Sequence, residues 1–202
     1  MKKSVVILGT GRTLSKFDEA EHSSSEIWAV GSAFSILKEK NTHVDKYFTL
    51  HKNETIEFDG EIVNQSNYPL DEIMSKFDSR FFTNSISYML AFALYYEVDS
   101  ISMYGVDMDS ESEYNFERPS VAYWIGFAKG LSVEVFIASG LDNPIFLYGF
   151  DDTSVLLSMM RERAKFSYDM AKHHMDLGDM KKSDQFLGQY ADNQYWIREL
   201  MG

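Results

Sequence analysis

The chain of 202 residues contains no cysteine and only three prolines. The absence of cysteine excludes disulfides, thiolate zinc sites and a cysteine nucleophile, and it agrees with a reducing compartment. No apolar run reaches the roughly 18 residues that a membrane span needs, and Met1-Lys2-Lys3 leads directly into a short strand instead of a signal peptide's apolar stretch. We therefore expect a cytoplasmic protein without a membrane span.

Basic residues are also scarce, with 19 Lys and Arg against 31 Asp and Glu, so the formal net charge is −12. Because a polyanion is repelled by such a surface and no basic cluster interrupts it, we expect no binding to duplex nucleic acid. The hydrophobic fraction of 45% and the aromatic fraction of 15% are typical of a folded globular protein with one sizeable core.

Short continuous apolar blocks alternate with helical patterns along the first 140 residues. Continuous blocks are typical of strands that are covered on both faces, so the alternation predicts an α/β domain with a mostly parallel sheet. The stretch from Lys52 to Tyr68 is polar and predicts an irregular insertion. The expected strands are 5–8, 27–30, 47–50, 81–82, 101–104 and 133–137, and the expected helices are 32–40, 69–77, 85–96 and 120–129.

After Pro144 the character of the sequence changes to a strand-free region rich in Met, Leu and aromatic residues. Apolar residues recur at three- and four-residue steps over 153–175 and 180–200, and Leu177-Gly178-Asp179 separates the two segments. This pattern predicts a helical hairpin, so we divide the chain into domains 1–150 and 151–202. The apolar stripes favour a homo-oligomer assembled through the hairpin, with packing against the sheet domain as the alternative.

An apolar strand at 4–8 runs into the turn Gly9-Thr10-Gly11-Arg12-Thr13. Two glycines allow a tight turn and a close backbone approach to an anion, so the turn predicts a nucleotide site. The third glycine of the dinucleotide fingerprint is replaced by Leu14, and no acidic residue clearly closes a second strand about twenty residues on, which argues against a standard NAD enzyme. The alternative is a tight strand-to-helix turn with no ligand.

Three further groups of polar residues follow predicted strands or begin predicted helices. Asp107 and Asp109 follow the strand at 101–104 and could hold Mg²⁺ or Mn²⁺, with helix capping and solvation as the alternative. His51 ends the strand at 47–50 and could act as general acid or base, with Lys52 neutralising phosphate. The residues that could bind a ligand at helix starts are Arg118, Ser120, Asn84 and Ser85, whose alternatives are an ion-pair brace for Arg118 and an ordinary N-cap for Asn84.

Four segments together resemble known proteins over about residues 3–145. They are Gly9-Thr10-Gly11-Arg12-Thr13-Leu14, Trp28-Ala29-Val30-Gly31, the stretch from Thr83 to Leu94, and the stretch from Ile101 to Met108. These segments are similar to bacterial sialyltransferases with a single Rossmann-like domain, and they also look like the motility accessory factor and pterin pyrophosphokinase-like group. A group of phage-encoded Rossmann-like proteins resembles the sequence more closely still. The shared segments are Glu113-Tyr114, Arg118-Pro119-Ser120, Tyr123-Trp124-Ile125-Gly126 and Ala128-Lys129-Gly130.

The resemblance implies a Rossmann-like α/β fold, here with a C-terminal α-helical hairpin, in which the first turn holds a nucleotide donor. It would place the protein in a host cytoplasm if the chain is phage-encoded. The sialyltransferases use a histidine after the Gly-x-Asp strand, but no histidine lies between His51 and His173, so His51 would have to replace it.

Taken together, these features predict a nucleotide or nucleotide-sugar binding protein with glycosyl transfer as the leading activity. In this interpretation Gly9 to Thr13 bind the donor phosphates, Arg118 or Lys52 stabilises the leaving group, and His51 or Asp107 deprotonates the acceptor. Two alternatives remain. One is a phage-type protein that sequesters or senses a nucleotide without reaction, and the other is an assembly module that uses the hairpin.

Overall fold

The computed structural model describes residues 3–51, 56–108, 113–142, 147, 150 and 152–201. The chain divides into two compact units, Met1–Asn143 and Pro144–Gly202. The boundary lies before the expected one at 150/151, between the last strand and the helical hairpin.

The first unit contains a six-stranded sheet in which every neighbouring pair of strands is parallel. The spatial order is β4-β3-β2-β1-β5-β6, so the chain builds outward from β1 on one side and then returns to its other side with β5. This order makes the fold a Rossmann-like α/β fold, as the sequence predicts. The strands are β1 Ser4–Leu8, β2 Glu26–Val30, β3 Lys46–Thr49, β4 Glu61–Asn64, β5 Ser100–Tyr104 and β6 Glu134–Ile137.

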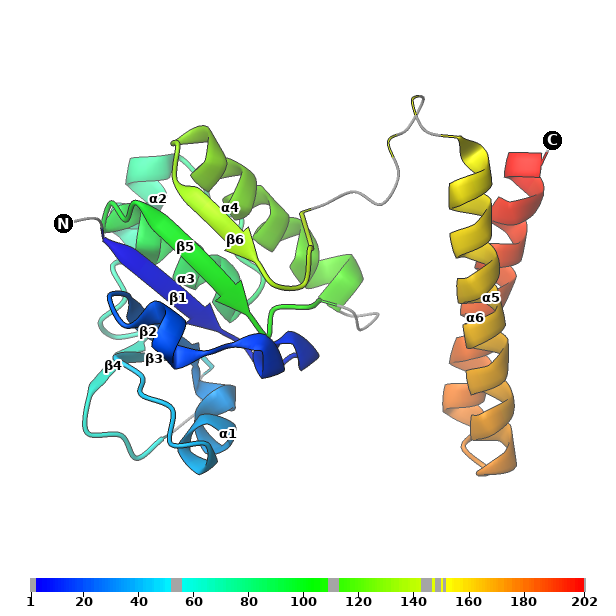
Figure 1. The fold of residues 1–202 in the computed structure, drawn as a ribbon, viewed down its shortest axis with the longest axis horizontal. Coiled ribbons are helices and arrows are strands. Elements are labelled where there is room, and N and C mark those ends of the chain that lie inside the picture. The colour runs from blue at the N-terminus through cyan, green and yellow to red at the C-terminus, as the bar shows by residue number, and fades with distance from the viewer. Residues whose placement is uncertain are drawn as a thin grey trace. The chain divides into compact units, whose positions relative to one another are not determined.

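Helices lie in the connections from β2 to β3, from β4 to β5 and from β5 to β6, and α2, α3 and α4 lie behind the sheet in Figure 1. The connection from β1 to β2 contains only two short 3-10 turns, and these lie in front of the sheet in the same view. The elements are the turns η1 Arg12–Lys16, η2 Glu19–His22, η3 Gly31–Ala33 and η4 Glu113–Glu117, and the helices α1 Phe34–Glu39, α2 Leu70–Phe77, α3 Ser85–Tyr95 and α4 Arg118–Gly130.

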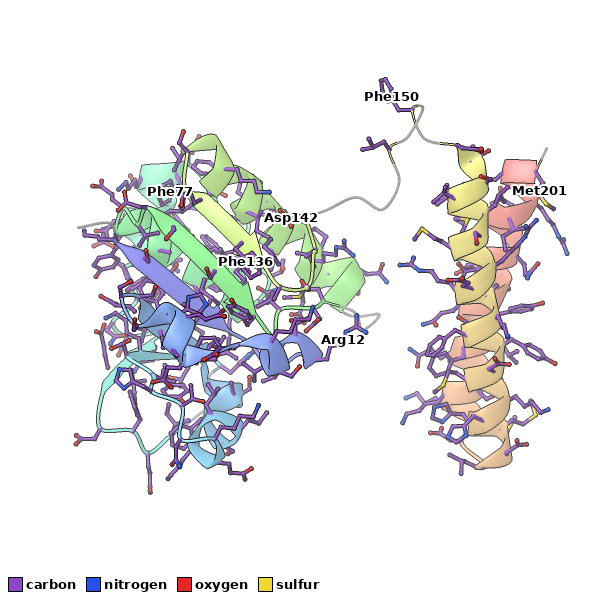
Figure 2. The ribbon with its side chains drawn as sticks, in the orientation of Figure 1. Arg12, Phe77, Phe136, Asp142, Phe150 and Met201 are labelled. Carbon is purple, nitrogen blue, oxygen red and sulfur yellow. The ribbon has the colours of Figure 1, made fainter. Side chains whose placement is uncertain are left out.

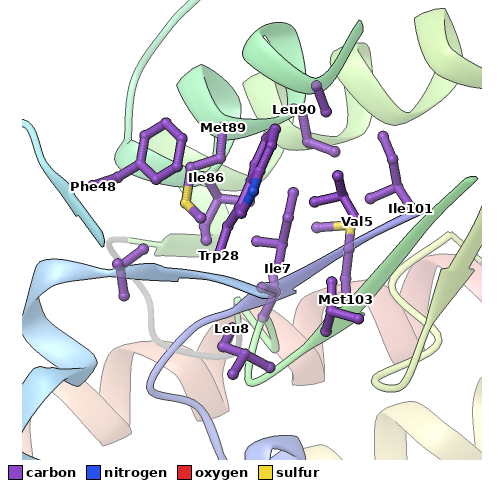
Figure 3. Close-up of a cluster of buried hydrophobic side chains, with 14 of the residues drawn as sticks. Val5, Ile7, Leu8, Trp28, Phe48, Ile86, Met89, Leu90, Ile101 and Met103 are labelled. Carbon is purple, nitrogen blue, oxygen red and sulfur yellow. The ribbon is translucent and has the colours of Figure 1, made fainter. Parts of the chain in front are cut away.

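The core lies between the central strands and α3 (Figure 3). Helix α3 is apolar on nearly all sides because it is buried by the sheet and by its neighbouring helices, including α4. Its Phe92 packs edge-on against Trp28 of β2 and Phe48 of β3, with ring centroids 5.4 and 5.3 Å apart. This packing fixes the N-terminus of α3 relative to the carboxyl ends of the strands.

Two details differ from the sequence prediction. The polar stretch 52–68 contains strand β4, which was missed because only Val63 of its four residues is fully buried. The strand expected at 81–82 is absent, since these residues form an irregular segment in which the Phe81 carbonyl accepts a hydrogen bond from Trp124 Nε1 at 2.9 Å. Phe82 stacks on Trp124 and Tyr88 instead of joining the sheet.

The second unit is the predicted hairpin of α5 Thr153–Asp176 and α6 Met180–Met201, which pack along their length. The turn between them contains Gly178, whose φ of +75° suits glycine. Among the described residues, neither helix nor any other is long and apolar enough to cross a bilayer.

Candidate functional site

A cavity of about 410 Å³ lies where the chain changes direction in the sheet, at the carboxyl ends of β1 and β5. Open α/β sheets bind ligands at this position because the connections of the two strands run to opposite sides and leave a crevice. The lining residues are Gly9, Thr10, Gly11, Arg12, Val30, Ser32, His51, Thr83, Asn84, Ser85, Ile86, Gly105, Val106, Asp107, Met108 and Glu117. The cavity thus brings together eight of the predicted site residues with seven from other positions and Gly105 of the Gly-x-Asp segment.

The glycines hold the turn after β1 against the turn after β5. Gly9 N–H donates to the Tyr104 carbonyl at 2.9 Å, and Gly11 N–H donates to the Gly105 carbonyl at 2.8 Å. A Cβ at Gly9 or Gly11 would overlap the Gly105 carbonyl, and one at Gly105, whose φ is +68°, would lie 2.6 Å from the Gly9 carbonyl oxygen. The glycines are therefore required for the contact between the two strand ends, in addition to any contact with a ligand.

Asp107 and Thr13 fasten the same two turns through side chains. Asp107 Oδ2 accepts hydrogen bonds from Thr13 N at 3.1 Å and from Thr13 Oγ1 at 3.0 Å. Thr13 Oγ1 in turn accepts a hydrogen bond from Gly105 N at 3.0 Å. A carboxylate of the protein therefore binds Thr13 N–H, which the sequence analysis assigned to a donor phosphate.

Arg12 covers the second oxygen of this carboxylate. Its Nε lies 3.6 Å from Asp107 Oδ1, while 79% of the Arg12 side chain is exposed and only 6% of the Asp107 side chain. Asp107 Oδ1 is buried and, among the residues that the structure describes, accepts no hydrogen bond. Figure 2 shows Arg12 at the end of the domain where β1 terminates. Because most of the Arg12 side chain is exposed, this contact contributes little to stability.

Asn84 is the N-cap of α3 and provides the other unmatched polar atom of the cavity wall. Its Oδ1 accepts from Ser87 N at 2.8 Å, and the Ser87 hydroxyl completes a capping box. Its Nδ2 is buried and donates no hydrogen bond. The cavity therefore has a buried donor at Asn84 and a buried acceptor at Asp107, and unmatched groups of this kind in a native protein call for a partner.

His51 follows β3 and also lines the cavity, with its side chain exposed. Lys52 and Asp109, which the sequence analysis assigned to phosphate and metal binding, lie outside the described residues. Within the described ranges, no group of three or more His, Asp or Glu side chains could hold a metal ion. The metal role of Asp107 and Asp109 stays a prediction.

Arg118 and Ser120 do not line the cavity. Helix α4 begins at Arg118, two residues before the expected start, so Ser120 lies inside its first turn. The buried Ser120 hydroxyl lies 2.5 Å from Thr83 Oγ1 and donates to the Glu117 carbonyl at 3.0 Å. Arg118 Nη2 donates to the Leu141 carbonyl at 3.2 Å. Both residues thus stabilise the chain around α4 in this structure.

Sequence reasoning missed several wall residues, among them Ser32, Thr83 and Glu117. Ser32 was detectable, because it follows the end of β2 at Val30 by two residues, and the carboxyl ends of parallel strands share one edge. Thr83 and Glu117 reach the wall through packing between the starts of α3 and α4, with no sequence signal of their own.

No family model matches the sequence, and no curated protein matches it. Two solved structures of the sialyltransferase CstII from Campylobacter jejuni are similar at 12% identity over 68% of this chain. One contains the substrate analogue cytidine-5'-monophosphate (TM-score 0.38, 80% of that chain), and the other contains CMP-3FNeuAc (TM-score 0.40, 81%). Neither bears on the expected likeness to phage-encoded proteins or to the motility accessory factor group. At this level of similarity the site is interpreted from its own residues.

Proposed function

We propose that residues 3–142 bind a nucleotide or a nucleotide sugar in the cavity between the ends of β1 and β5, with glycosyl transfer as the activity. The observation that carries this proposal is a pair of buried polar atoms in the cavity wall, Asn84 Nδ2 and Asp107 Oδ1, which make no hydrogen bond to the described residues. Leaving a buried donor or acceptor unmatched costs about 1–3 kcal/mol, and a ligand that supplies both partners recovers this cost on binding.

The charges of the wall restrict the ligand. Arg12 provides a cation, whereas Asp107 and Glu117 provide carboxylates. A ligand that pairs with this wall carries one anionic group for Arg12 and hydroxyl donors for the Asp107 carboxylate. The phosphate and ribose of a nucleotide meet both requirements, and a volume of about 410 Å³ lies within the range of small-ligand sites.

The proposed reaction uses His51 as the base. In glycosyl transfer, His51 removes the proton from an acceptor hydroxyl, whose oxygen bonds to the anomeric carbon as the bond from that carbon to the donor phosphate oxygen breaks. Arg12 stabilises the negative charge that appears on the leaving phosphate. We assign a positioning role to Asp107, because its Oδ2 already accepts two hydrogen bonds from Thr13.

Binding without reaction is the second candidate. It is favoured by the exposure of His51, since an exposed imidazole is poorly fixed relative to an acceptor, and by the internal hydrogen bonds of Asp107. Mass spectrometry of molecules that copurify with the protein identifies the nucleotide. Incubation with the matching nucleotide sugar and simple sugar acceptors then separates the two candidates, because only an enzyme consumes the donor.

The substitution Asn84→Asp tests the ligand site without removing the helix cap. Aspartate retains the oxygen that accepts from Ser87 N and is as good an N-cap as asparagine, but it replaces the donor Nδ2 by a second carboxylate oxygen. Thermal shift with nucleoside monophosphates and nucleotide sugars selects the ligand, and calorimetry measures its affinity. We expect Asn84→Asp to weaken binding by about tenfold or more, because one hydrogen bond is lost and a repulsive charge is added.

The matched control is Asn41→Asp, which adds the same charge at an exposed position outside the cavity wall. Asn41 has a φ of +52°, which aspartate also tolerates. This variant should bind the nucleotide as the parent does. Equal affinity of Asn84→Asp and Asn41→Asp, or a parent protein that no nucleotide stabilises, would contradict the proposal.

A further inference from the structure

Helices α5 and α6 contact each other through one regular stripe on each helix, which we call the inner seam. Residues at alternating three- and four-residue steps are the most buried of the hairpin, as in an antiparallel coiled coil. Most of the fully buried ones are small, and Ile197 is the exception among them. The inner seam comprises Leu157, Met160, Ala164, Ser167, Ala171 and His174 on α5 and Ser183, Phe186, Tyr190, Asn193, Ile197 and Leu200 on α6.

Helix α5 carries a second stripe with the same spacing, one residue before each position of the inner seam, and we call it the outer seam. It comprises Leu156, Met159, Arg163, Phe166, Met170 and His173 on α5, and Leu177, the C-cap residue that follows the helix and continues the spacing. Phe166 is 60% exposed and Leu177 is 66% exposed, so these two side chains lie largely outside the pairing with α6. A stripe that repeats every seven residues over the whole helix is typical of a surface that packs against another helix.

The inner seam divides the hairpin into two sides. Arg161 and Met201 each follow an inner-seam residue, and they contact each other, with Arg161 Nη2 3.4 Å from Met201 Sδ. In an antiparallel pair of helices, the residues that follow the inner seam lie on one side of the hairpin, and the residues that precede it lie on the other side. Trp196 precedes Ile197 and is 54% exposed, so it lies on the same side as the outer seam.

We propose that the outer seam binds the outer seam of a second copy of this chain, with the two α5 helices antiparallel and Phe166 on the twofold axis. The spacing of its residues is nearly the same in both directions around Phe166, with steps of three and four residues each way. An antiparallel copy therefore places Leu156 against Leu177 and Met159 against His173. A self-complementary surface of this kind is what a twofold interface requires.

Charge complementarity supports the same arrangement. In the proposed pair, Arg163 of one copy lies beside Met170 and Asp169 of the second copy. Arg163 and Asp169 are exposed, and within the described part of the chain neither forms an ion pair. Association would bring these two unpaired charges of opposite sign together twice, once on each side of the axis.

The test compares two substitutions on opposite sides of α5. Phe166→Glu places a carboxylate at the centre of the proposed interface, whereas Met175→Glu places one on the side of Arg161, at a position that is 48% exposed. We expect light scattering at tens of micromolar to give a dimer for the parent and for Met175→Glu. We expect Phe166→Glu to be monomeric, with dimer affinity reduced more than about 100-fold, because a buried, unpaired charge opposes association. Helix content by circular dichroism should be equal in all three proteins, since both positions are exposed.

The absence of cysteine allows a second measurement, which tests the direction of the helices. Phe166→Cys should cross-link to itself with a short bismaleimide, and Met175→Cys should not. Leu156→Cys should cross-link when mixed with Leu177→Cys, but not with itself. A monomeric parent would overturn the proposal and leave the outer seam to another part of the chain. A dimer that survives Phe166→Glu, or Leu156→Cys that cross-links to itself, would also overturn it.

Discussion

Thr13 joins the two halves of the site with a single hydroxyl group. The hydroxyl donates to Asp107 Oδ2 and accepts from Gly105 N, and the residue is 5% exposed. Both partners belong to the segment after β5, while Thr13 belongs to the turn after β1. The relative position of the two strand ends, and hence the shape of the cavity between them, depends on this residue.

Thr13→Val should therefore destabilise the protein by about 2–4 kcal/mol, because Gly105 N–H loses its acceptor and Asp107 loses a donor in a buried site. Thr13→Ser retains the hydroxyl and should cost less than about 1.5 kcal/mol, the value for one lost buried methyl group. Urea unfolding measures both changes in the free energy of unfolding. If valine and serine cost the same, the hydroxyl does not hold the two turns together.

The sequence predicts that the turn from Gly9 to Thr13 belongs to the site, but it does not predict which residues this turn contacts. Gly9 and Gly11 follow an apolar strand, and this local pattern is enough to predict a tight turn. Their contacts with Gly105 and Asp107 join segments about ninety residues apart, and no pattern in a single sequence specifies such a pair. A substitution such as Gly11→Val is consequently a poor test of ligand binding, since its Cβ would overlap the Asp107 carboxylate with or without a ligand.

Elements were predictable where apolar residues form a continuous block or a periodic stripe, and ambiguous elsewhere. Strands β1, β2, β3, β5 and β6 and all six helices lie close to their expected ranges, because each has a strong apolar pattern. Strand β4 has only Ile62 and Val63 between polar residues, so its sequence resembles a loop, whereas the other edge strand, β6, has three consecutive apolar residues. The pair Phe81 and Phe82 is apolar enough for a strand, but helix packing around Trp124 uses both residues.

Lys46 connects three strands at their amino-terminal ends, on the side of the sheet opposite the cavity. Its Nζ lies 2.8 Å from Glu61 Oε2 of β4 and 3.1 Å from Glu26 Oε2 of β2, and Lys46 itself begins β3. Burial alone would lower the pKa of Lys46, but hydrogen bonds to Glu61 and Glu26 and their charges outweigh it and raise the pKa above 10.5. Burial likewise raises the pKa of Tyr68, with a further contribution from Tyr88.

These two shifts predict the stability of the protein in alkaline solution. A group with a raised pKa in the folded state contributes stability that is complete below its unfolded pKa and is lost as the pH rises through the folded value. The free energy of unfolding should therefore fall above about pH 10, and Lys46→Met should make this fall shallower. Urea unfolding from about pH 8 to about pH 11 measures it. Equal slopes for parent and variant would show that Lys46 does not contribute.

At the scale of the whole molecule, the two units carry different parts of the proposed function. Every cavity residue lies between Gly9 and Glu117, and the main core cluster lies within the first unit. The hairpin has its own inner seam and contributes the surface proposed for self-association. The sequence predicts this division from the change in composition after Pro144, because helices and sheet domains have different apolar periods.

Residues 1–143 alone should consequently fold, bind the selected nucleotide and remain monomeric. The expected affinity lies within about twofold of that of the full chain, since a site held inside one unit loses no contact when the other is removed. Analytical ultracentrifugation of both proteins measures the mass, calorimetry measures the affinity, and near-ultraviolet circular dichroism reports whether Trp28 and Trp124 remain packed. If the shortened chain keeps this spectrum but binds more than about tenfold more weakly, a difference of 1.4 kcal/mol, the hairpin contributes to the site. Dimerisation of the shortened chain would instead place the interface on the sheet domain.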